Sequence, residues 1–465
     1  MKPSSRLTRL HFIGIGGSGM SVLAEVLTSW GFRISGSDGQ ASEALTHLKD
    51  LGIRVETGHR AANVGEANVV VYSSAVPADN PELVEARRRG IPTVKRAEML
   101  GEVLRGKYAL AVSGTHGKTT TTTMLGRIWL HAGKDPTLLA GGNARGENLS
   151  AVAGAGEVLI VEADEFDRSF LAMRPAAAII GNIDSDHLDC YGDLDSIKDA
   201  FTQFAEGLPF YGLIVANLDD EGVRSILPRL ARRTVTYGRS KEADYRAVDV
   251  RSDGLGMAFT LERKGTKLGE LVLKVPGIHN VYNALGAAVL SLEEGLSFKE
   301  VERGLREYPG VKRRLEYRGQ KSGITFYDDY AHHPTEVAAA LQAARGLVAE
   351  GNVGKGRLVA VFQPHLYSRT QQLHNEFAQS FRGCDELFVT RIFAARETPI
   401  PGVEGDLITK GAAYGILPAD KVHYVEDLET LPETVVSKLR AGDLVMTMGA
   451  GDIGTRCTRI MEALA

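Results

Sequence analysis

The chain has 465 residues, of which 43% are hydrophobic and 24% are charged, and its formal net charge is -4. This length exceeds one ordinary hydrophobic core and favours roughly three domains. The nearly balanced charge argues against nucleic-acid binding, which needs a clustered basic face. There is no run of about 20 apolar residues, so the sequence predicts no membrane span.

The cysteines and the N-terminal residues indicate a cytoplasmic protein. Cys190, Cys384 and Cys457 are scattered and odd in number, which favours buried thiols over disulfides or a cysteine metal site. The first residues lead directly into an apolar strand and lack the hydrophobic region of a signal peptide.

The first block, residues 1–106, alternates apolar strands with helical patterns. Apolar side chains recur at helical spacing from Met20 to Trp30, and Gly31 predicts the end of that helix. The expected strands are "LHFIGIG", "FRISGSD", "IRVETGH" and "VVVYSSAV". Strands separated by helices predict a parallel sheet covered on both faces, so this block is interpreted as Rossmann-like.

A glycine motif opens this block. Gly14, Gly16 and Gly19 have the spacing G-x-G-x-x-G, and Asp38 follows at the end of the next strand. Taken alone, the motif predicts a dinucleotide site and an NAD-dependent oxidoreductase. The same spacing recurs in "MGAGDIG" at residues 448–454. A lone turn of this kind indicates only a strand-to-helix junction that a phosphate, or another part of the backbone, can approach closely.

The second block, residues 107–312, begins with a phosphate loop. The stretch "VSGTHGKTT" follows an apolar strand and opens a helix, although Val112 stands where the strict motif has glycine. Backbone N–H groups from Gly114 to Lys118 are expected to cradle phosphates, and Lys118 adds a positive charge. The hydroxyl of Thr119 can bind Mg²⁺. The predicted ATP-binding residues here are Gly114, Thr115, His116, Gly117, Lys118, Thr119 and Thr120.

Residues 119–123 are five consecutive threonines. Threonine forms helices poorly because its branched β-carbon restricts χ1, and five in succession cost about 2 kcal/mol relative to alanine. The alternative to a nucleotide site is an accidental turn before a helix. The nucleotide interpretation is preferred.

Two further apolar runs of this block end in acidic and imidazole side chains. The first presents Glu162, Asp164, Glu165 and Asp167, and the second presents Asp184, Asp186, His187 and Asp189. Ligands of an open α/β sheet lie outside the carboxyl ends of its strands, so both segments are expected to face the phosphate loop. Thr119 and Glu162 are predicted to hold one Mg²⁺, and His187 a second ion. For Asp193 and Asp195, solvated or helix-capping roles are preferred.

Residues 245–275 alternate more strongly and predict a small antiparallel excursion. The third block, residues 313–465, is expected to be another parallel α/β unit. Its predicted strands are "ITFYDDY", "RLVAVFQPH", "ELFVTRI", "KVHYV" and "DLVMTMGAG".

These motifs together resemble one known family. In chain order they are "SGTHGKTTTTTMLG", "VEADEFDRSF", "NIDSDHLDCY", "GIHNVYNALGAA", "GVKRRLE" and "YDDYAHHPTEV", and they resemble the Mur ligases of peptidoglycan synthesis. The resemblance runs from about residue 11 to about residue 455. The segments "HFIGIGGSGMS", "SSAV" and "FQPHLYSRT" are most similar to members that join L-alanine to UDP-N-acetylmuramate.

The resemblance implies three α/β domains, with an N-terminal Rossmann-like domain, a central ATPase domain and a C-terminal Rossmann-like domain that closes over the amino acid. It also implies that the first glycine turn holds the pyrophosphate of a UDP-sugar rather than NAD. The implied UDP-sugar residues are Gly14, Gly16, Gly17, Ser18, Gly19, Met20, Asp38, His59, Ser73 and Ser74.

Further site residues follow from the resemblance in the later blocks. Asn280 and Asn283 are expected beside the adenine, although both could instead cap a helix. Arg314 and Asp329 are expected to reach the nucleotide, although Arg313 and Arg314 could instead be a linker charge pair. The residues implied at the alanine and muramate end are Tyr330, His332, His365 and Arg369.

The implied reaction consumes ATP, with two Mg²⁺ ions, to form an amide. The muramate carboxylate attacks the γ-phosphate, and L-alanine then displaces phosphate from the acyl phosphate. Lys118, Asp329, His332, His365 and Arg369 are the expected catalytic residues, with either histidine as the base. The chain is expected to act as a monomer or homodimer.

Three alternatives remain open. One is a related ligase that adds a murein peptide to the same UDP-sugar, or one that acts on folate. The second is the NAD-dependent oxidoreductase, which leaves the phosphate loop and the acidic segments without a role. The third is a non-catalytic nucleotide switch.

Overall fold

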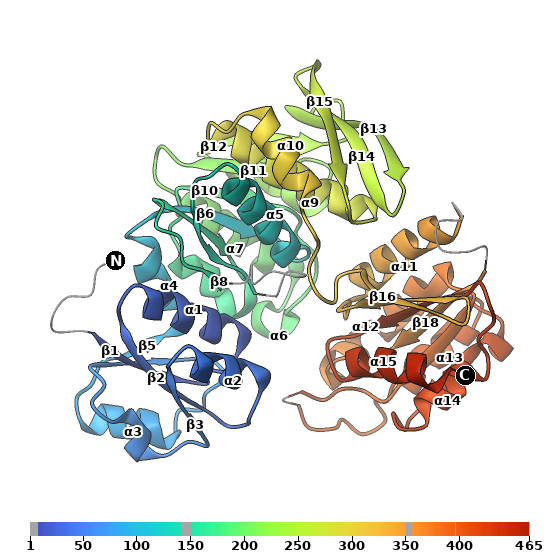
Figure 1. The fold of residues 1–465 in the computed structure, drawn as a ribbon, viewed down its shortest axis with the longest axis horizontal. Helices are drawn as coiled ribbons and strands as arrows, with labels where there is room; N and C mark the ends of the chain where they lie inside the picture. Colours follow the sequence, from blue (N-terminus) through green and yellow to red (C-terminus); the bar gives the residue numbers. More distant parts are fainter. Residues whose placement is uncertain (1–7, 142–150, 350–355, 396, 465) are drawn as a thin grey trace. The chain divides into compact units, whose positions relative to one another are not determined.

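The computed structural model describes residues 8–141, 151–349, 356–395 and 397–464, and the side chains of Ser18 and Asp189 lie outside that description (Figure 1). The chain forms two compact units. The first comprises the residues up to Asp249 together with Phe259–Leu271 and Tyr282–Tyr308. The second comprises Val250–Ala258, Val272–Val281 and the residues from Pro309 onward.

The N-terminal sheet has five parallel strands in the order β3-β2-β1-β4-β5. Its strands are β1 (Arg9–Ile13), β2 (Arg33–Asp38), β3 (Arg54–Thr57), β4 (Val69–Tyr72) and β5 (Thr93–Lys95). The connecting helices are α1 (Ser18–Ser29), α2 (Glu43–Asp50), η1 (Ala61–Val64), α3 (Pro81–Arg88) and α4 (Arg96–Leu104). One face packs on α1 and α2, and the other packs on η1 and α3, because the strands are apolar on both sides.

A second sheet has ten strands, in the order β15-β14-β13-β12-β11-β10-β6-β9-β7-β8, and belongs to the first unit except for parts of β13, β14 and β15. Its strands are β6 (Tyr108–Ser113), β7 (Thr137–Leu139), β8 (Ala151–Val152), β9 (Val158–Glu162), β10 (Ala177–Ile180), β11 (Leu213–Asn217), β12 (Arg233–Gly238), β13 (Tyr245–Asp253), β14 (Gly256–Arg263) and β15 (Thr266–Leu273). Strand β6 lies between β9 and β10 and is parallel to both, so the three carboxyl ends meet at one edge.

Helices and short 3₁₀ segments connect these strands. They are α5 (Lys118–His131), η2 (Phe166–Ala172), α6 (Leu188–Tyr191), α7 (Leu194–Glu206), α8 (Glu221–Ile226), η3 (Leu227–Arg229), α9 (Ile278–Glu293) and α10 (Phe298–Arg306). The five threonines are helical and form the start of α5. Asp193 is the N-cap of α7 and accepts from the Ser196 amide, as the capping interpretation predicts.

The two sheets of the first unit share one hydrophobic cluster. It runs from Phe12 and Leu100 of the N-terminal block to Phe170 and Phe201 of the central block. The contact is close at Gly101, where a Cβ would stand 2.8 Å from the Ala172 carbonyl oxygen. These two blocks are therefore packed together in one compact unit.

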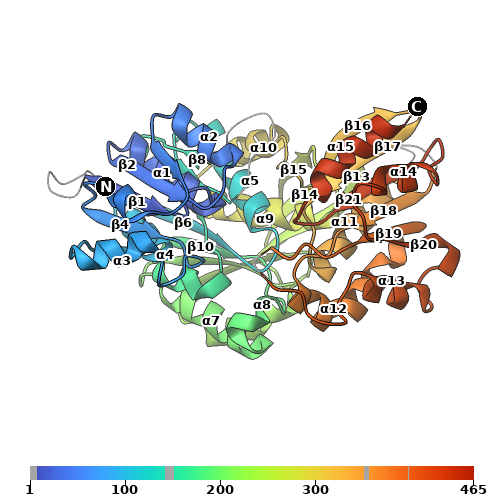
Figure 2. The same cartoon turned by 90° about the horizontal axis from the view of Figure 1, so that it is seen from below.

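The second unit contains a six-stranded sheet in the order β16-β17-β21-β18-β19-β20. Its elements are β16 (Glu316–Lys321), β17 (Ile324–Asp329), α11 (Pro334–Ala349), β18 (Leu358–Phe362), α12 (Tyr367–Ser380), η4 (Phe381–Gly383), β19 (Glu386–Thr390), α13 (Asp406–Ala413), η5 (Ala419–Lys421), β20 (Val422–Val425), α14 (Leu431–Val436), β21 (Leu444–Met448) and α15 (Ile453–Ala463). Figure 2 shows α14 and α15 on one side of the sheet and α12 and α13 on the other, and each pair covers its own hydrophobic cluster.

The α/β fold class expected from the sequence is confirmed. All nine strands quoted for the first and third blocks are present, whereas the short edge strands β5 and β16 were missed. β16 pairs antiparallel with β17, is largely polar, and contains a bulge near Gly319, so it lacks the apolar run that marks the others. Among the helices in the described part of the chain, none combines the length and apolar character needed to cross a membrane.

Candidate functional site

The phosphate loop joins the end of β6 to α5. Gly117 is the N-cap of α5 with φ of 77°, a left-handed conformation that favours glycine. A side chain there would also collide with Asn283, because its Cβ would stand 2.6 Å from Asn283 Oδ1. Asn283 of α9 is thus brought against the phosphate loop.

Asn182, which follows β10, holds this loop from the neighbouring strand. Its Oδ1 accepts from the His116 amide at 2.7 Å, and its Nδ2 donates to the His116 carbonyl at 2.9 Å. The Thr115 amide donates to the Asn182 carbonyl at 3.1 Å. The expectation that every amide from Gly114 to Lys118 points into the cradle is therefore wrong for Thr115 and His116, because Asn182 uses both. The first-turn amides of α5, which have no acceptor within the helix, are the donors left for an anion.

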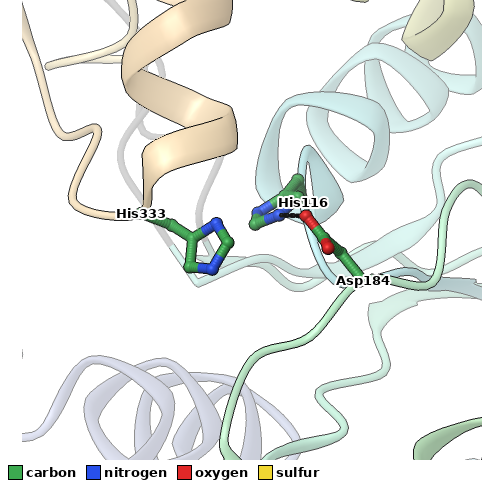
Figure 3. A group of neighbouring side chains, drawn as sticks. All are labelled: His116, Asp184 and His333. Carbon is green, nitrogen blue, oxygen red and sulfur yellow. Dashed lines mark hydrogen bonds and ion pairs between the residues drawn. The ribbon is translucent and has the colours of Figure 1, made fainter. Parts of the chain in front are cut away.

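The His116 side chain is paired with Asp184. Nε2 of His116 lies 3.0 Å from Asp184 Oδ2, and Figure 3 shows the imidazole of the loop directed at this carboxylate. Because a carboxylate only accepts, Nε2 carries a proton. The Asp184 backbone amide also donates to the Thr115 hydroxyl oxygen at 2.9 Å. The segment after β10 therefore fixes both the backbone and the imidazole of the loop.

Lys118 is buried and folded back onto its own loop. Its Nζ donates to the carbonyls of Gly114 and Thr115 at 2.9 and 3.1 Å, and to Glu165 Oε2 at 2.7 Å. Burial alone would lower the pKa of Lys118, but the negative charges of Glu165 and Asp164 outweigh it and hold that pKa above its usual value. The ammonium group is a permanent charge at the phosphate loop.

The predicted metal ligands Thr119 and Glu162 meet at the carboxyl ends of β6 and β9. The Thr119 hydroxyl lies 3.0 and 3.1 Å from the two Glu162 oxygens, and Glu162 Oε2 also accepts from the Gly141 amide. Burial raises the pKa of Glu162, although Lys118 opposes the shift. A bound cation would offset this cost of burying the charge.

His187 lies near these predicted metal ligands, beside the carboxylate of Glu165. Its Nε2 lies 3.9 Å from Glu165 Oε1. That oxygen is buried and makes no hydrogen bond to any residue the structure describes. Hydroxyl and carboxylate oxygens are the ligand types Mg²⁺ prefers, so Thr119, Glu162 and the orphaned oxygen of Glu165 fit this ion, with His187 beside them.

Residues of β2 accept several of the backbone amides of the first glycine turn, so these amides are not available to a ligand. The amides of Gly14 and Ile15 donate to the Ser37 carbonyl at 2.8 and 3.0 Å, and the Gly16 amide donates to Asp38 Oδ2 at 2.9 Å. One oxygen of Asp38 is thus used to hold the turn itself. The N-terminus of α1, which begins at Ser18, is the part of the turn left to hold phosphates.

The other predicted UDP-sugar residues are placed around this turn. Ser73 and Ser74 follow β4, and a Cβ on Gly14 would stand 3.6 Å from the Ser73 Cβ. His59 follows β3, and its Nδ1 lies 3.1 Å from Ser37 Oγ. Met20 lies in the first turn of α1, and its side chain is buried in the core rather than exposed to a ligand. The Ser18 side chain lies outside the described residues.

Arg96 is an additional charge beside this turn that sequence reasoning missed. A Cβ on Gly19 would stand 2.6 Å from Arg96 Nη1, so the guanidinium lies against the N-terminal turn of α1. The sequence carries no signal for this role, because Arg96 follows another basic residue, Lys95, at the start of α4.

The third glycine turn, in "MGAGDIG", is filled by the protein. A Cβ on Gly451 would stand 2.6 Å from Gln363 Oε1, and a Cβ on Gly454 would stand 2.7 Å from Arg313 Nε. The buried Gln363 also accepts from the Ile453 amide at the start of α15. The glycines of this turn therefore allow Gln363 and Arg313 to pack closely against the backbone.

The C-terminal candidates gather at the carboxyl ends of β17 and β18. The His332 ring centroid lies 5.2 Å from that of Tyr330 and 5.6 Å from that of His365, and Arg369 Nη1 lies 3.5 Å from His365 Nδ1. Arg314 lies over the Tyr330 ring at 5.4 Å. The side chains predicted from the sequence for this end of the site therefore lie close together in the fold.

Hydrogen bonds fix the protonation of the two histidines in this cluster. His332 Nδ1 lies 2.9 Å from the Tyr330 carbonyl, so Nδ1 carries the proton and Nε2 is the basic nitrogen of the neutral ring. His365 Nδ1 faces the guanidinium of Arg369, which only donates, so this nitrogen accepts. Glu336, which the sequence analysis missed, lies 3.3 Å from His332 and 3.5 Å from Arg314.

The remaining candidates have structural contacts of their own. Asn280, in the first turn of α9, donates through Nδ2 to the Pro276 carbonyl at 2.7 Å. Asp329 is buried and accepts from the amides of Leu315 and Ala331. Arg313 pairs with Asp328 at 2.9 Å and so anchors the start of the second unit.

Comparison with known proteins identifies the class. Three family models match: the Mur ligase family, catalytic domain, over residues 9–108; the Mur ligase middle domain over residues 112–291; and the Mur ligase, glutamate ligase domain, over residues 313–451. The chain belongs to the Mur ligase family.

Particular relatives share nearly the whole length. The UDP-N-acetylmuramate–L-alanine ligase of Trichlorobacter lovleyi is 45% identical over 96% of this chain and 97% of its own. That of Myxococcus xanthus is 46% identical over 98% and 95%. The crystal structure of the UDP-N-acetylmuramate-alanine ligase from Thermotoga maritima, 31% identical, has a TM-score of 0.81 and covers 98% of both chains.

A structure with a different acceptor is also similar. The murein peptide ligase from Psychrobacter arcticus is 25% identical, with a TM-score of 0.71 and 98% of both chains covered.

Proposed function

We propose that this chain is an ATP-dependent ligase that joins L-alanine to the carboxylate of UDP-N-acetylmuramate, a step of peptidoglycan precursor synthesis. The observation that carries the proposal is the meeting of Lys118, Thr119 and Glu162 at the carboxyl ends of β6 and β9, in a chain of the Mur ligase family. Relatives at 45 and 46% identity over nearly the full length carry the name of this activity.

ATP is assigned to the phosphate loop. The first-turn amides of α5 and the ammonium group of Lys118 supply positive charge for the β- and γ-phosphates. Asn283 lies against Gly117 and is assigned to the adenine side with Asn280, and Arg314 and Asp329 are assigned to the nucleotide from the C-terminal domain. Lys118 must exchange part of its contact with Glu165 for phosphate, because all three of its protons are engaged in the protein alone.

Magnesium is assigned to Thr119 and Glu162, with His187 and the unpaired oxygen of Glu165 as ligands of a second ion. When bound, the ions supply charge neutralisation for the γ-phosphate. The residues of the chain then have two tasks: to hold the phosphates in line with the muramate carboxylate, and to keep the Lys118 charge beside them.

The UDP-sugar is assigned to the first glycine turn. The N-terminus of α1 and the Arg96 guanidinium suit a diphosphate, and Asp38, His59, Ser73 and Ser74 surround the turn. This assignment replaces NAD, which the glycine motif alone predicts.

The amino acid is assigned to the cluster of Tyr330, His332, His365 and Arg369. We propose His332 as the base that takes the proton of the alanine ammonium group, because Nδ1 is committed to the Tyr330 carbonyl and Nε2 is the basic nitrogen. The neutral amine attacks the acyl phosphate at its carbonyl carbon, and phosphate leaves.

Three further assignments accompany the proposal. The domains are residues 1–106 for the UDP-sugar, 107–312 for ATP and 313–465 for the amino acid, and the three family matches, one for each domain, support the division. The protein acts in the cytoplasm, where Cys190, Cys384 and Cys457 stay reduced, as the free thiols they are in the structure. It acts as a monomer or homodimer.

Phosphate release from ATP and Mg²⁺ tests the proposal. Release that requires both UDP-N-acetylmuramate and L-alanine is the expected result. Release with a murein tripeptide but not with alanine would move the assignment to a peptide ligase, the second candidate that the Psychrobacter arcticus structure favours. Absence of turnover with either acceptor would contradict the proposal.

Glu162→Gln tests the metal assignment in the same assay. We expect phosphate release to fall at least about tenfold at low Mg²⁺, because a charged ligand contributes more than about 1.4 kcal/mol. Glu157→Gln is the matched control, since Glu157 is exposed just before the opposite end of β9. Equal activity of the two variants at every Mg²⁺ concentration would remove Glu162 from the site.

A further inference from the structure

Glu82 is a carboxylate buried inside the N-terminal block. It lies in the first turn of α3 and is 0% exposed. Its Oε2 accepts from Ser37 Oγ at 2.6 Å and lies 3.2 Å from His11 Nε2. Its Oε1 accepts from Asn63 Nδ2 at 2.6 Å and from the Arg60 amide at 3.1 Å. The four donors fill the four acceptor positions of a carboxylate.

This carboxylate is ionised in the folded protein. Burial alone would raise the pKa of Glu82, but hydrogen bonds from His11, Ser37 and Asn63 lower it to about 2. An ionised carboxylate only accepts, so the single hydroxyl proton of Ser37 points to Glu82.

The direction of that proton determines the state of His59. Ser37 Oγ lies 3.1 Å from His59 Nδ1 and has already given its proton to Glu82. Nδ1 must therefore be the donor, and Glu82 Oε1, 3.6 Å from Nδ1, favours a proton on the same nitrogen. The neutral imidazole then has its lone pair on Nε2. That nitrogen is directed toward Gly39, at the end of β2, where a Cβ would stand 3.9 Å from it.

The same contacts hold the elements that carry the glycine turn and His59. Asn63 links Glu82 to the Gly58 carbonyl at 3.0 Å, next to His59. The Ser37 carbonyl accepts the amides of Gly14 and Ile15. One buried carboxylate therefore supports β2, the segment after β3 and the glycine turn from behind.

We infer that Glu82 is a positioning residue of the UDP-sugar site, which acts through Ser37 to hold His59 in the Nδ1-protonated form with Nε2 presented to the ligand. The inference rests on the proposed function for the identity of the ligand, whereas the state of the imidazole is a property of the protein alone.

Glu82→Gln tests this chain of hydrogen bonds. Asn63 Nδ2 and the Arg60 amide can only donate, so the glutamine must turn its oxygen toward them and its amide NH₂ toward Ser37. The Ser37 hydroxyl then accepts from glutamine and donates to His59 Nδ1, and the neutral ring moves to the Nε2-protonated form.

The first measurement is the ¹⁵N spectrum of the histidine rings in the full chain without ligand, at about pH 8, where an ordinary histidine is neutral. His59 is assigned from the signal lost in His59→Gln. We expect the Nδ1-protonated pattern in the unsubstituted protein and the opposite pattern in Glu82→Gln. Glu85→Gln is the control, because Glu85 lies on the same helix and pairs with Arg88 at the surface. An unchanged His59 signal in Glu82→Gln would overturn the inference.

The second measurement separates positioning from general support of the fold. In Glu82→Gln we expect KM for UDP-N-acetylmuramate to rise about tenfold, with kcat and KM for ATP changed less than about twofold. Because Glu82 acts through His59, the double variant Glu82→Gln/His59→Gln should match His59→Gln alone. The inference would be overturned if the two substitutions multiplied each other's effect on KM for UDP-N-acetylmuramate. It would also be overturned if KM rose equally for UDP-N-acetylmuramate and for ATP.

The two readouts distinguish failure of this inference from failure of the proposed function. If the unsubstituted protein does not turn over UDP-N-acetylmuramate, the proposed function fails, and the spectrum still decides the role of Glu82. If Glu82→Gln does not fold, Ser37→Ala is used, because it removes the hydrogen-bond partner of His59 Nδ1 and leaves only the longer contact of 3.6 Å with Glu82. A His59 signal unaltered by Ser37→Ala would then overturn the inference.

Discussion

Asp329 shows how burial and backbone contacts set the chemistry of one side chain. It ends β17, is buried, and both its oxygens accept backbone amides, from Leu315 and Ala331, at 2.7 Å. Burial raises the pKa of Asp329 from 3.8 to about 6, although the positive charge of Arg314 opposes the shift. A carboxyl with this pKa binds a proton more tightly in the folded than in the unfolded chain.

This shift makes a prediction about stability and pH. Between pH 3.8 and about 6 the folded state binds more protons at Asp329 than the unfolded state, so its contribution to the unfolding free energy falls as pH rises and levels off above about 6. In Asp329→Asn that dependence is absent. We expect the stability of Asp329→Asn relative to the unsubstituted protein to increase across this window by at most about 3 kcal/mol.

Urea unfolding at several pH values measures this difference. Asp193→Asn is the control, because Asp193 is an exposed cap whose pKa is lowered by the Ser196 amide. The stability of Asp193→Asn relative to the unsubstituted protein should not increase over the same pH window. If the stability of Asp329→Asn relative to the unsubstituted protein stays constant or falls as pH rises, the raised pKa of Asp329 is contradicted.

At the scale of elements, three parallel strands determine where the chemistry lies. Strand β6 ends at the phosphate loop, β9 ends at Glu162, and β10 is followed by Asn182. Because these strands are neighbours, residues far apart in the chain contact each other at one edge. Helix α5 then presents its N-terminus there, although its first residues are poor helix formers.

The threonines of α5 differ in what their hydroxyls contact, and this gives a matched test. Thr123 Oγ1 contacts the carbonyls of Thr119 and Thr120 and lies 2.9 Å from the Tyr308 hydroxyl. Thr122 Oγ1 is buried and makes no hydrogen bond to any residue that the structure describes. The two neighbours have the same helix propensity and shape, so their hydroxyls account for any difference.

We expect Thr122→Val to stabilise the protein by about 1 kcal/mol, because it removes an unsatisfied polar group and keeps the volume. We expect Thr123→Val to destabilise it by about 1–2 kcal/mol, because the hydrogen bond between the Thr123 and Tyr308 hydroxyls is lost. Chemical denaturation of the two variants side by side measures both. Equal effects, or effects of reversed order, would show that the hydroxyl contacts are not the cause.

At the scale of the whole molecule, two compact units have separate cores. The N-terminal and central blocks share a hydrophobic cluster, whereas the six-stranded sheet of the second unit has clusters of its own on each face. Shared apolar burial makes elements unfold together, because opening one exposes the surface of the other.

Calorimetry is therefore expected to show two transitions. UDP-N-acetylmuramate at about 100 times its Kd should raise the transition of the first unit, by a stabilisation of about 2.7 kcal/mol. Phe377→Ala, in the core of the second unit, should lower only the other transition, with a cost of about 3–5 kcal/mol. One transition that responds to both changes would show that the units unfold as one. NAD should shift neither, and a shift with NAD would restore the oxidoreductase alternative.

The sequence by itself determined the α/β class, most strands, the phosphate loop and the candidate acids, because apolar runs and glycine-to-helix junctions are local features of the chain. It could not distinguish three similar glycine turns. Only the tertiary structure shows that Gln363 and Arg313 fill the last of them, and that Ser37 and Asp38 close part of the first.

The tertiary structure alone also assigned roles to Asn182, Glu82, Glu336 and Arg96, although Asn182 and Glu336 lie within motifs that the sequence analysis identified. Each acts on a residue from another strand or helix: Asn182 on His116, Glu82 on Ser37, and Glu336 on Arg314. The physical reason is that hydrogen bonds and ion pairs depend on distance in space. The order of strands in a sheet, rather than the order of residues in the chain, decides which side chains come within that distance.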